Sequence, residues 1–181
     1  ASSLLNMPAA TAELQANAPV QNIDIVNWEQ FDYRPKVTFQ AGWNRDGLLL
    51  HFKVDEQHIL SAHTELDAPA YQDSCVEFFY SPTGDMSYYN LEMSCTGSRL
   101  WHYKTAEGQK TAFAGEDLEK IVIKTSLPPY TLIDNREGGH WELTVFIPAE
   151  CLPEGFLESG REFTANFYKC GDNTVQKHYL T

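Results

Sequence analysis

The sequence predicts an all-β protein: an antiparallel β-sandwich, jelly-roll or immunoglobulin-like, with about nine or ten short strands. Aromatic residues, which favour strands, make up 13% of the 181 residues. Short runs of alternating apolar and polar residues recur along the chain, separated by turns rich in Gly, Pro, Asn and Asp. Runs with helical periodicity are scarce. Together these observations argue against a mainly helical fold.

The first half of the chain begins with an arm and continues into strands. Residues 1–20 are rich in Ala and lack a clear period, so we interpret them as an N-terminal arm before a domain over residues 21–181. A turn around Asp46-Gly47 has the backbone freedom of a hairpin, and residues 55–72 are expected to form a long loop. The candidate strands of this half lie at Ile23–Trp28, Val37–Trp43 and Leu48–Val54.

The second half of the chain carries a further series of short strands. Residues 105–119 are polar and are assigned to a connecting segment. Pro148–Leu152 is expected to form one helical turn, because proline suits the first position of a helix. The candidate strands here share alternation and lie at Arg99–Lys104, Ile121–Ser126, Trp141–Ile147, Arg161–Cys170 and His178–Leu180.

Between these halves lies an unusually polar strand pair, residues 73–97. Side chains alternate along a strand, so each run has one apolar face and one face that carries acids. The apolar faces of the two strands come together only if the numbers of each pair of opposed residues add up to an odd sum. This register places Cys75 and Cys95 on opposite sides of the sheet. We expect buried free thiols at Cys75, Cys95, Cys151 and Cys170, whose spacing fits no zinc motif, with a disulfide as the less favoured alternative. The other face then collects Glu77, Phe79, Asn90, Glu92 and Ser94.

The formal net charge of −12 argues against nucleic acid and anionic membranes as partners. It is compatible with neutral ligands and with a structural calcium held by carboxylates, although the loop acids lack the spacing of an EF-hand. No apolar run approaches the roughly 20 residues that cross a bilayer. The expected partners therefore exclude nucleic acid and the membrane interior.

Two alternatives involve chemistry at these positions. Glu77 and Glu92 could form the carboxylate pair of a glycan-processing enzyme, although the common catalytic and nucleotide-binding motifs are absent. A haem could be held by Met93 with His102 or His140, although Met93 is more simply explained as a core residue of its strand. The six histidines are scattered and are expected to lie at the surface or to bond locally.

Several segments, in this order and spacing, resemble the family 9 carbohydrate-binding modules and their family 9-like relatives. Those modules are β-sandwich domains attached to xylanases or found in bacterial polysaccharide-processing proteins. The resemblance implies a non-catalytic domain that binds a plant- or host-type oligosaccharide or polysaccharide. The segments that carry it are LLLHFKVDE, DSCVEFFYSP, YYNLEMSCTG, HWELTVFIPAECL and FTANFYKCGD.

The resemblance also implies a site in which aromatic rings stack on the sugar and acids accept its hydroxyl groups. Tyr71 stands where the family carries its first Trp, and Glu92 replaces a basic residue of the xylanase-linked modules. The family's second aromatic ring comes from a loop beyond the last strand. We therefore expect Tyr71 to be the only aromatic wall of the site within residues 1–181. The implied site residues are Tyr71, Glu77, Glu92, Ser94, Asn166 and Tyr168.

The family further implies an extracytoplasmic location, secreted, periplasmic or at the cell surface, and a role in polysaccharide utilisation. A monomer that requires no cofactor is expected. A structural calcium would follow the family's habit, but the sequence does not place its ligands.

Overall fold

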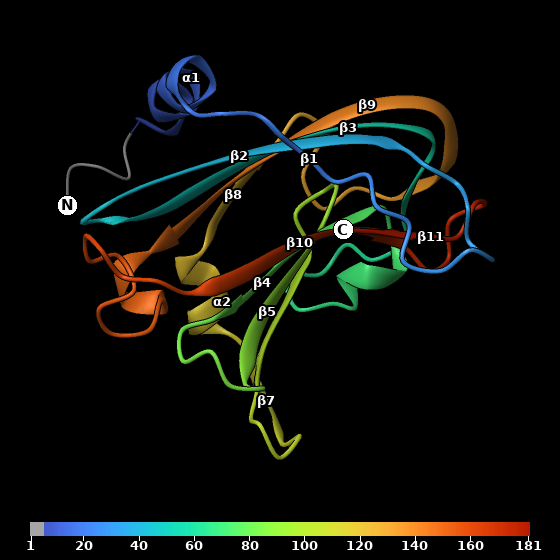
Figure 1. Cartoon of the computed structure of the whole chain (residues 1–181). Coiled ribbons are helices and arrows are strands. Elements are labelled where there is room, and N and C mark those ends of the chain that lie inside the picture. The colour runs from blue at the N-terminus through green and yellow to red at the C-terminus, as the bar shows by residue number, and fades with distance from the viewer. Residues whose placement is uncertain (1–5) are drawn as a thin grey trace.

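The computed structural model describes residues 6–181, and two antiparallel sheets pack face to face in it (Figure 1). The predicted all-β sandwich is confirmed, with 11 strands among the described residues. Sheet A has the order β1 (Gln21–Asn22), β2 (Lys36–Asn44), β3 (Gly47–Ser61), β9 (Ile133–Pro148), β8 (Val122–Thr125). Sheet B has the order β11 (His178–Leu180), β10 (Thr164–Gly171), β4 (Cys75–Ser81), β5 (Tyr88–Ser94), β6 (Arg99–Lys104), β7 (Lys110–Phe113).

The long strands of sheet A extend further than the sequence predicted. The β2–β3 hairpin around Asp46-Gly47 is confirmed. However, β3 continues to Ser61 through residues that we assigned to a loop, because β9, which is similarly long, pairs with it as far as Ile133. Polar residues interrupt the alternation in this last part of β3. The residues of β9 that pair with them lie more than 70 positions further along the sequence, as in the pair Ser61 and Ile133. Local pattern alone therefore underestimates both strands.

The sequence analysis did not predict α1 (Met7–Asn17), β7 or α2 (Glu116–Lys120). Helix α1 occupies most of the predicted arm and lies over sheet A, with Met7 and Leu14 buried (Figure 1). Strand β7 and helix α2 lie in the predicted polar connection. Conversely, the strand expected at Ile23–Trp28 is reduced to a single bridge between Val26 and Leu180. The predicted turn after Pro148 is present as η3 (Ala149–Cys151).

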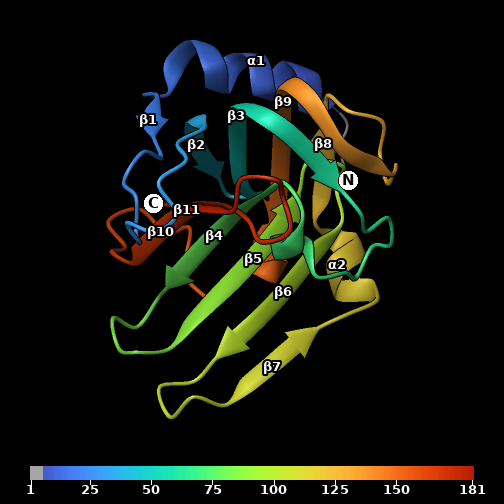
Figure 2. The same ribbon diagram turned by 90° about the vertical axis from the view of Figure 1, so that its right-hand side faces the viewer.

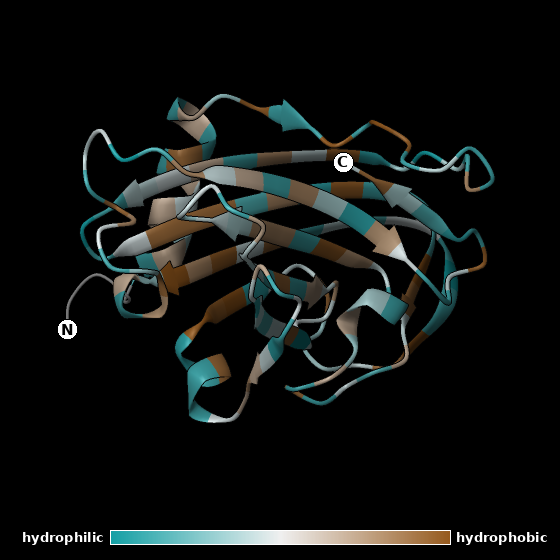
Figure 3. Cartoon of the chain, turned by 60° about the horizontal axis from the view of Figure 1, so that its bottom comes forward, coloured by the Kyte–Doolittle hydropathy of each residue, from teal (hydrophilic) through white to brown (hydrophobic). Residues whose placement is uncertain are grey.

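The β4–β5 hairpin has the predicted register. Val76 pairs with Met93 and Phe78 with Leu91, and all four side chains enter the core between the sheets. Cys95 also lies in this core, whereas Cys75 lies on the other side of sheet B in a small cluster. The four cysteines are buried and unbridged, as expected. Figure 2 shows β4 to β7 side by side, and Figure 3 shows apolar bands alternating with polar ones along the strands.

A buried ion pair in the core orients β10. Lys169 is completely buried, and its ammonium lies 2.9 Å from the Glu56 carboxylate. Trp141 donates its indole N–H to the same carboxylate at 2.6 Å. Burial lowers the pKa of His178 to about 3, so its neutral ring accepts from Lys169 at 2.8 Å. With Lys169 turned inward, the alternation of the strand places Tyr168 on the outer face of sheet B.

No helix within residues 6–181 combines the length and the apolar character needed to cross a membrane.

Candidate functional site

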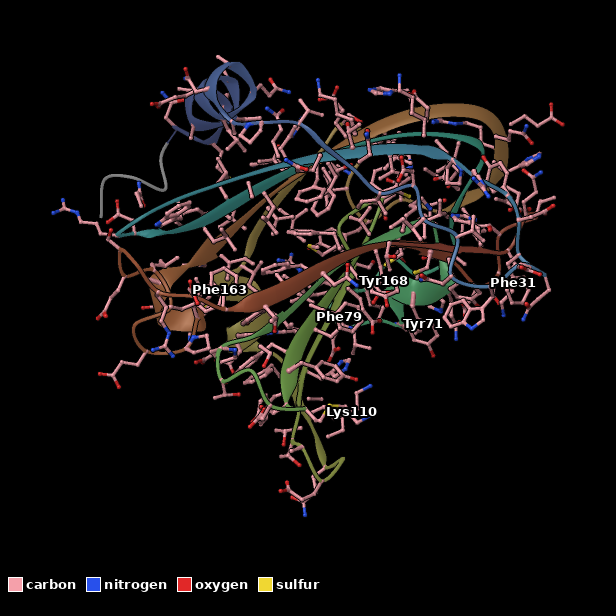
Figure 4. All side chains as sticks on the ribbon, viewed as in Figure 1. Phe31, Tyr71, Phe79, Lys110, Phe163 and Tyr168 are labelled. Carbon is pink, nitrogen blue, oxygen red and sulfur yellow. The ribbon has the colours of Figure 1, made fainter. Side chains whose placement is uncertain are left out.

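The outer face of sheet B gathers acids, amides and aromatic rings from neighbouring strands. The central pairs are Glu77 with Glu92 on β4 and β5, and Glu77 with Tyr168 on β4 and β10. Two positions further along, and so on the same face, Phe79 pairs with both Asn90 and Asn166. In Figure 4 the labelled rings of Phe79 and Tyr168 lie below β10, on the side away from sheet A. The sheet order thus assembles side chains that are far apart in sequence.

Two carboxylates form the floor of this face. Asn90 donates hydrogen bonds to Glu77 at 3.1 Å and to Glu92 at 3.0 Å. Cys170 donates its thiol to the other Glu77 oxygen at 3.0 Å. Burial raises the pKa of Glu77, although these two donors oppose the shift. Burial, and then the charge of Glu77, raise the pKa of Glu92 to about 8. Glu92 therefore retains its proton near neutral pH.

His102 and Lys110 continue the polar face across β6 and β7. His102 pairs with Asn90 and is almost completely buried. Burial lowers the pKa of His102 to about 4, and the charges of Lys110 and Lys104 add to this effect. The imidazole is consequently neutral at physiological pH. Its Nδ1, together with Asn90 Oδ1 and Glu92 Oε2, is buried without a hydrogen-bond partner.

An aromatic pocket adjoins the acids. The ring of Phe79 lies 4.9 Å from Tyr168 and 5.6 Å from Tyr88, measured between centroids. These rings line a pocket of about 310 Å³, which is at the lower end of the size range of small-molecule sites. Its wall also carries the polar side chains Asn166, Asp85 and Ser87. A ligand with apolar faces and hydroxyl groups suits this lining.

Tyr71 closes one end of the face. It lies in the short helix η2 (Ala70–Gln72) and packs against Cys75 and Cys170. Tyr179 packs on the same cluster, and its ring contacts the half-exposed Trp28 at 5.0 Å between centroids. The sequence analysis expected Tyr71 to be the only aromatic wall of the site, whereas the structure places further aromatic rings beside it.

The comparisons decide the family. The model for carbohydrate-binding family 9 matches residues 8–181. The chain belongs to this family. A protein of Bacteroides uniformis, named for an inferred carbohydrate-binding role, has a crystal structure with 30% identity and a TM-score of 0.90, covering 99% of this chain and 84% of that one. Comparison with curated protein sequences finds no match.

Two structures of a family 9 carbohydrate-binding module from Caldicellulosiruptor kristjanssonii, one with glucose and one with cellotriose, have the same fold. Each is 16% identical with a TM-score of 0.51, over 91% of this chain. The matched regions cover 74% of the glucose-bound chain and 72% of the cellotriose-bound chain. The predicted resemblance is thus confirmed, and this chain is a non-catalytic carbohydrate-binding domain.

The predicted site residues of this family 9 domain lie on one face but differ in access. Glu77 and Glu92 form the floor, and Tyr168 and Asn166 stand at the pocket. Ser94 is completely buried beside Thr96, at 3.4 Å between hydroxyl oxygens, so it faces no solvent. The fold buries Ser94 because η2 packs over this end of β5.

The sequence analysis did not include four further residues of this face among the implied site residues. Phe79 and Asn90 were assigned to the polar face but not to the site, and Tyr88 and His102 were not assigned there at all. A signal for Tyr88 was present, because alternation places it with Asn90 and Glu92. His102 could be identified only once β6 was known to pair with β5.

The haem alternative is wrong for this domain. Met93 is completely buried in the core, whereas His102 lies on the opposite face of sheet B. His140 lies in sheet A and bonds to Asp55 at 2.8 Å and Glu142 at 3.1 Å. No pair of these side chains can flank one iron. The enzyme alternative at Glu77 and Glu92 is likewise overturned, since the family is non-catalytic.

The described residues offer one set of three potential metal ligands within 4.8 Å of one another: Cys75, Glu77 and Cys170. Two thiols make this a soft donor set, unlike the all-oxygen shell that calcium prefers. It is therefore not the calcium site that the resemblance implied.

Proposed function

We propose that the domain binds its carbohydrate on the outer face of sheet B, in the pocket beside the acid pair. Tyr168 carries this proposal, because it connects the two parts of the face. It is the direct strand partner of Glu77, and its ring packs on Phe79 and lines the pocket. A pyranose would stack its C–H face on these rings while its hydroxyl groups reach the polar side chains.

Each polar group has a role in this arrangement. Asn166 is exposed at the pocket and offers an amide to ligand hydroxyls. Glu77 and Glu92 lie deeper: an ionised carboxylate accepts a ligand hydroxyl hydrogen in a charge-assisted hydrogen bond, and the protonated Glu92 can donate its own hydrogen to a ligand oxygen. Tyr71 supplies a further ring at the end of the face. Binding requires no bond cleavage.

Finer expectations rest on family membership. We propose that the ligand is a neutral oligosaccharide or polysaccharide of plant or host type, and that the domain acts as a monomer outside the cytoplasm in polysaccharide utilisation. A structural calcium held by loop acids also belongs to the proposal. Treatment with a chelator, followed by thermal unfolding, tests it: an unchanged melting temperature contradicts the calcium.

Calorimetry with glucose, cellotriose and a panel of neutral oligosaccharides tests the site. Tyr168→Ala should weaken binding at least tenfold, which corresponds to about 1.4 kcal/mol. Trp43→Ala is the matched control, because Trp43 is 67% exposed on sheet A. If only the Trp43 variant lost binding, the ligand would bind on sheet A, and the proposed site on sheet B would be contradicted. Product release by the wild type would contradict a purely binding role.

A further inference from the structure

Two cysteines lie next to Glu77 and under η2, at the end of the binding face away from the pocket. Cys75 on β4 and Cys170 on β10 are direct partners in the antiparallel register, and both are buried on the outer face of sheet B. Their sulfur atoms lie within 4.8 Å of each other. Ala70 completes their small cluster, with Tyr71 and Tyr179 packed against it.

Their backbone positions suit a disulfide. Directly opposed residues of antiparallel strands have Cα atoms about 4.5 or 5.5 Å apart, depending on the hydrogen-bonding pattern. Disulfides accept Cα separations of roughly 4.4 to 6.8 Å, so either pattern allows the bond. Cys95 lies on the other face of sheet B, in the core. Cys151 lies in η3, against the same core.

The pair is linked to the site through one hydrogen bond. Cys170 donates its thiol hydrogen to Glu77 at 3.0 Å, and this bond lowers the pKa of Glu77. A disulfide sulfur has no hydrogen to donate. Oxidation would therefore remove one of the two side-chain donors that Glu77 has, leaving only Asn90.

We propose that Cys75 and Cys170 are a redox-active pair whose oxidation to a disulfide weakens carbohydrate binding. The effect on binding rests on the proposed function at Glu77, whereas the formation of the bond does not. The oxidant is a low-molecular-weight disulfide. One thiolate attacks it and releases one thiol, and the second thiolate then displaces the other. Two protein thiols thereby lose two protons and two electrons, and the oxidant becomes two thiols.

Burial controls the rate of this exchange. It raises the pKa of Cys75 to about 11. The hydrogen bond with Cys75, and then burial, hold the pKa of Cys170 well above its usual range. Because the thiolate is the attacking species, exchange is slow at neutral pH and faster under alkaline conditions. Opening of η2, which covers the pair, gives the oxidant access.

The bond is tested by incubating the full chain with oxidised glutathione at mildly alkaline pH. Thiols counted in denaturant should fall from four to two, and the mass should decrease by two hydrogens. Peptide mapping should join the peptides that contain Cys75 and Cys170. Cys75→Ser should abolish this bridge, whereas Cys151→Ser should retain it. A constant thiol count, or a bridge that involves Cys95 or Cys151, overturns the proposal.

The effect on binding is measured on the same samples. Sugar affinity should be about fivefold weaker after oxidation, the size of one lost hydrogen bond, and a dithiol reductant should restore it. Cys170→Ser keeps a hydroxyl donor towards Glu77 and should make binding insensitive to the oxidant. Equal affinity of the bridged and reduced wild type overturns the regulatory effect. If the reduced protein binds no sugar at all, the proposed function is overturned instead. In that case the thiol count still tests whether the disulfide forms.

Discussion

Glu77 and Glu92 are direct partners across β4 and β5, and one side chain, Asn90, donates a hydrogen bond to each carboxylate. Two buried acids in such proximity resist ionising together, because burial and mutual repulsion both favour the neutral form. The pKa of Glu92 is accordingly raised to about 8 and that of Glu77 is also raised. The proposed binding face therefore has a charge that depends on pH.

We predict that the stability of the domain falls as the pH rises from about 6.5 to about 8 because of Glu92. In this window the folded protein holds a proton that the unfolded chain releases, so a higher pH favours unfolding. Below 6.5, the ordinary pKa of histidine, the lowered pKa values of His102 and His178 oppose this effect. The slope that Glu92 contributes is at most about 1.4 kcal/mol per pH unit. Urea unfolding at several pH values measures it.

Glu92→Gln removes this titration and should flatten the profile in the same window. Glu150→Gln is a suitable control, because Glu150 is an exposed glutamate in η3, directly after β9 and outside the binding face. If the Glu92 variant keeps the wild-type slope, another group holds the proton.

Asn90→Ala should weaken sugar binding about tenfold, since it removes the donor that positions both carboxylates. The Asn90 hydrogen bond lowers the pKa of Glu77, so its loss should raise that pKa further. Calorimetry gives the affinity, and carboxyl chemical shifts followed by NMR give the titration. Unchanged affinity together with an unchanged titration would show that the amide does not organise the acids.

The sequence predicted the β4–β5 hairpin and its register because alternation is a local signal. Both apolar faces could be read from neighbouring residues, and only one register brought them together. The extension of β3 to Ser61 could not be predicted in this way. It depends on pairing with β9, and the polar residues around Glu56 conceal it locally. Glu56 is buried only because Lys169 and Trp141 reach it from other strands.

The candidate site shows the same division. Alternation indicated the acid pair, and the family resemblance added Tyr168. His102 and Tyr88 join the face only through the order of strands in sheet B, which no local pattern encodes. Ser94 was expected at the surface but is covered by η2. The path of a covering loop depends on tertiary packing, so its effect on Ser94 could not be read from the strand itself.

Lys169→Met should destabilise the domain by about 3 to 5 kcal/mol, because it leaves the Glu56 charge buried without its partner. The double variant Lys169→Met with Glu56→Gln should recover much of this loss, since no charge then remains in the core. Urea unfolding of the wild type, the single variant and the double variant measures the difference. Equal losses in the single and double variants would show that packing, rather than the unpaired charge, determines the cost.

Gly47→Ala should destabilise the β2–β3 hairpin by about 1 to 3 kcal/mol. A Cβ at this position would overlap the backbone carbonyl oxygen of Ile147 and lie 2.7 Å from the ring of Phe146. The backbone of β9 cannot move aside without breaking its pairing with β3. Gly42→Ala is the matched control in the same hairpin, because its Cβ meets only the flexible end of Leu14, at 2.7 Å. Thermal unfolding should therefore rank wild type and Gly42→Ala close together and Gly47→Ala well below; the reverse order would mean that α1, not β9, limits the space around this hairpin.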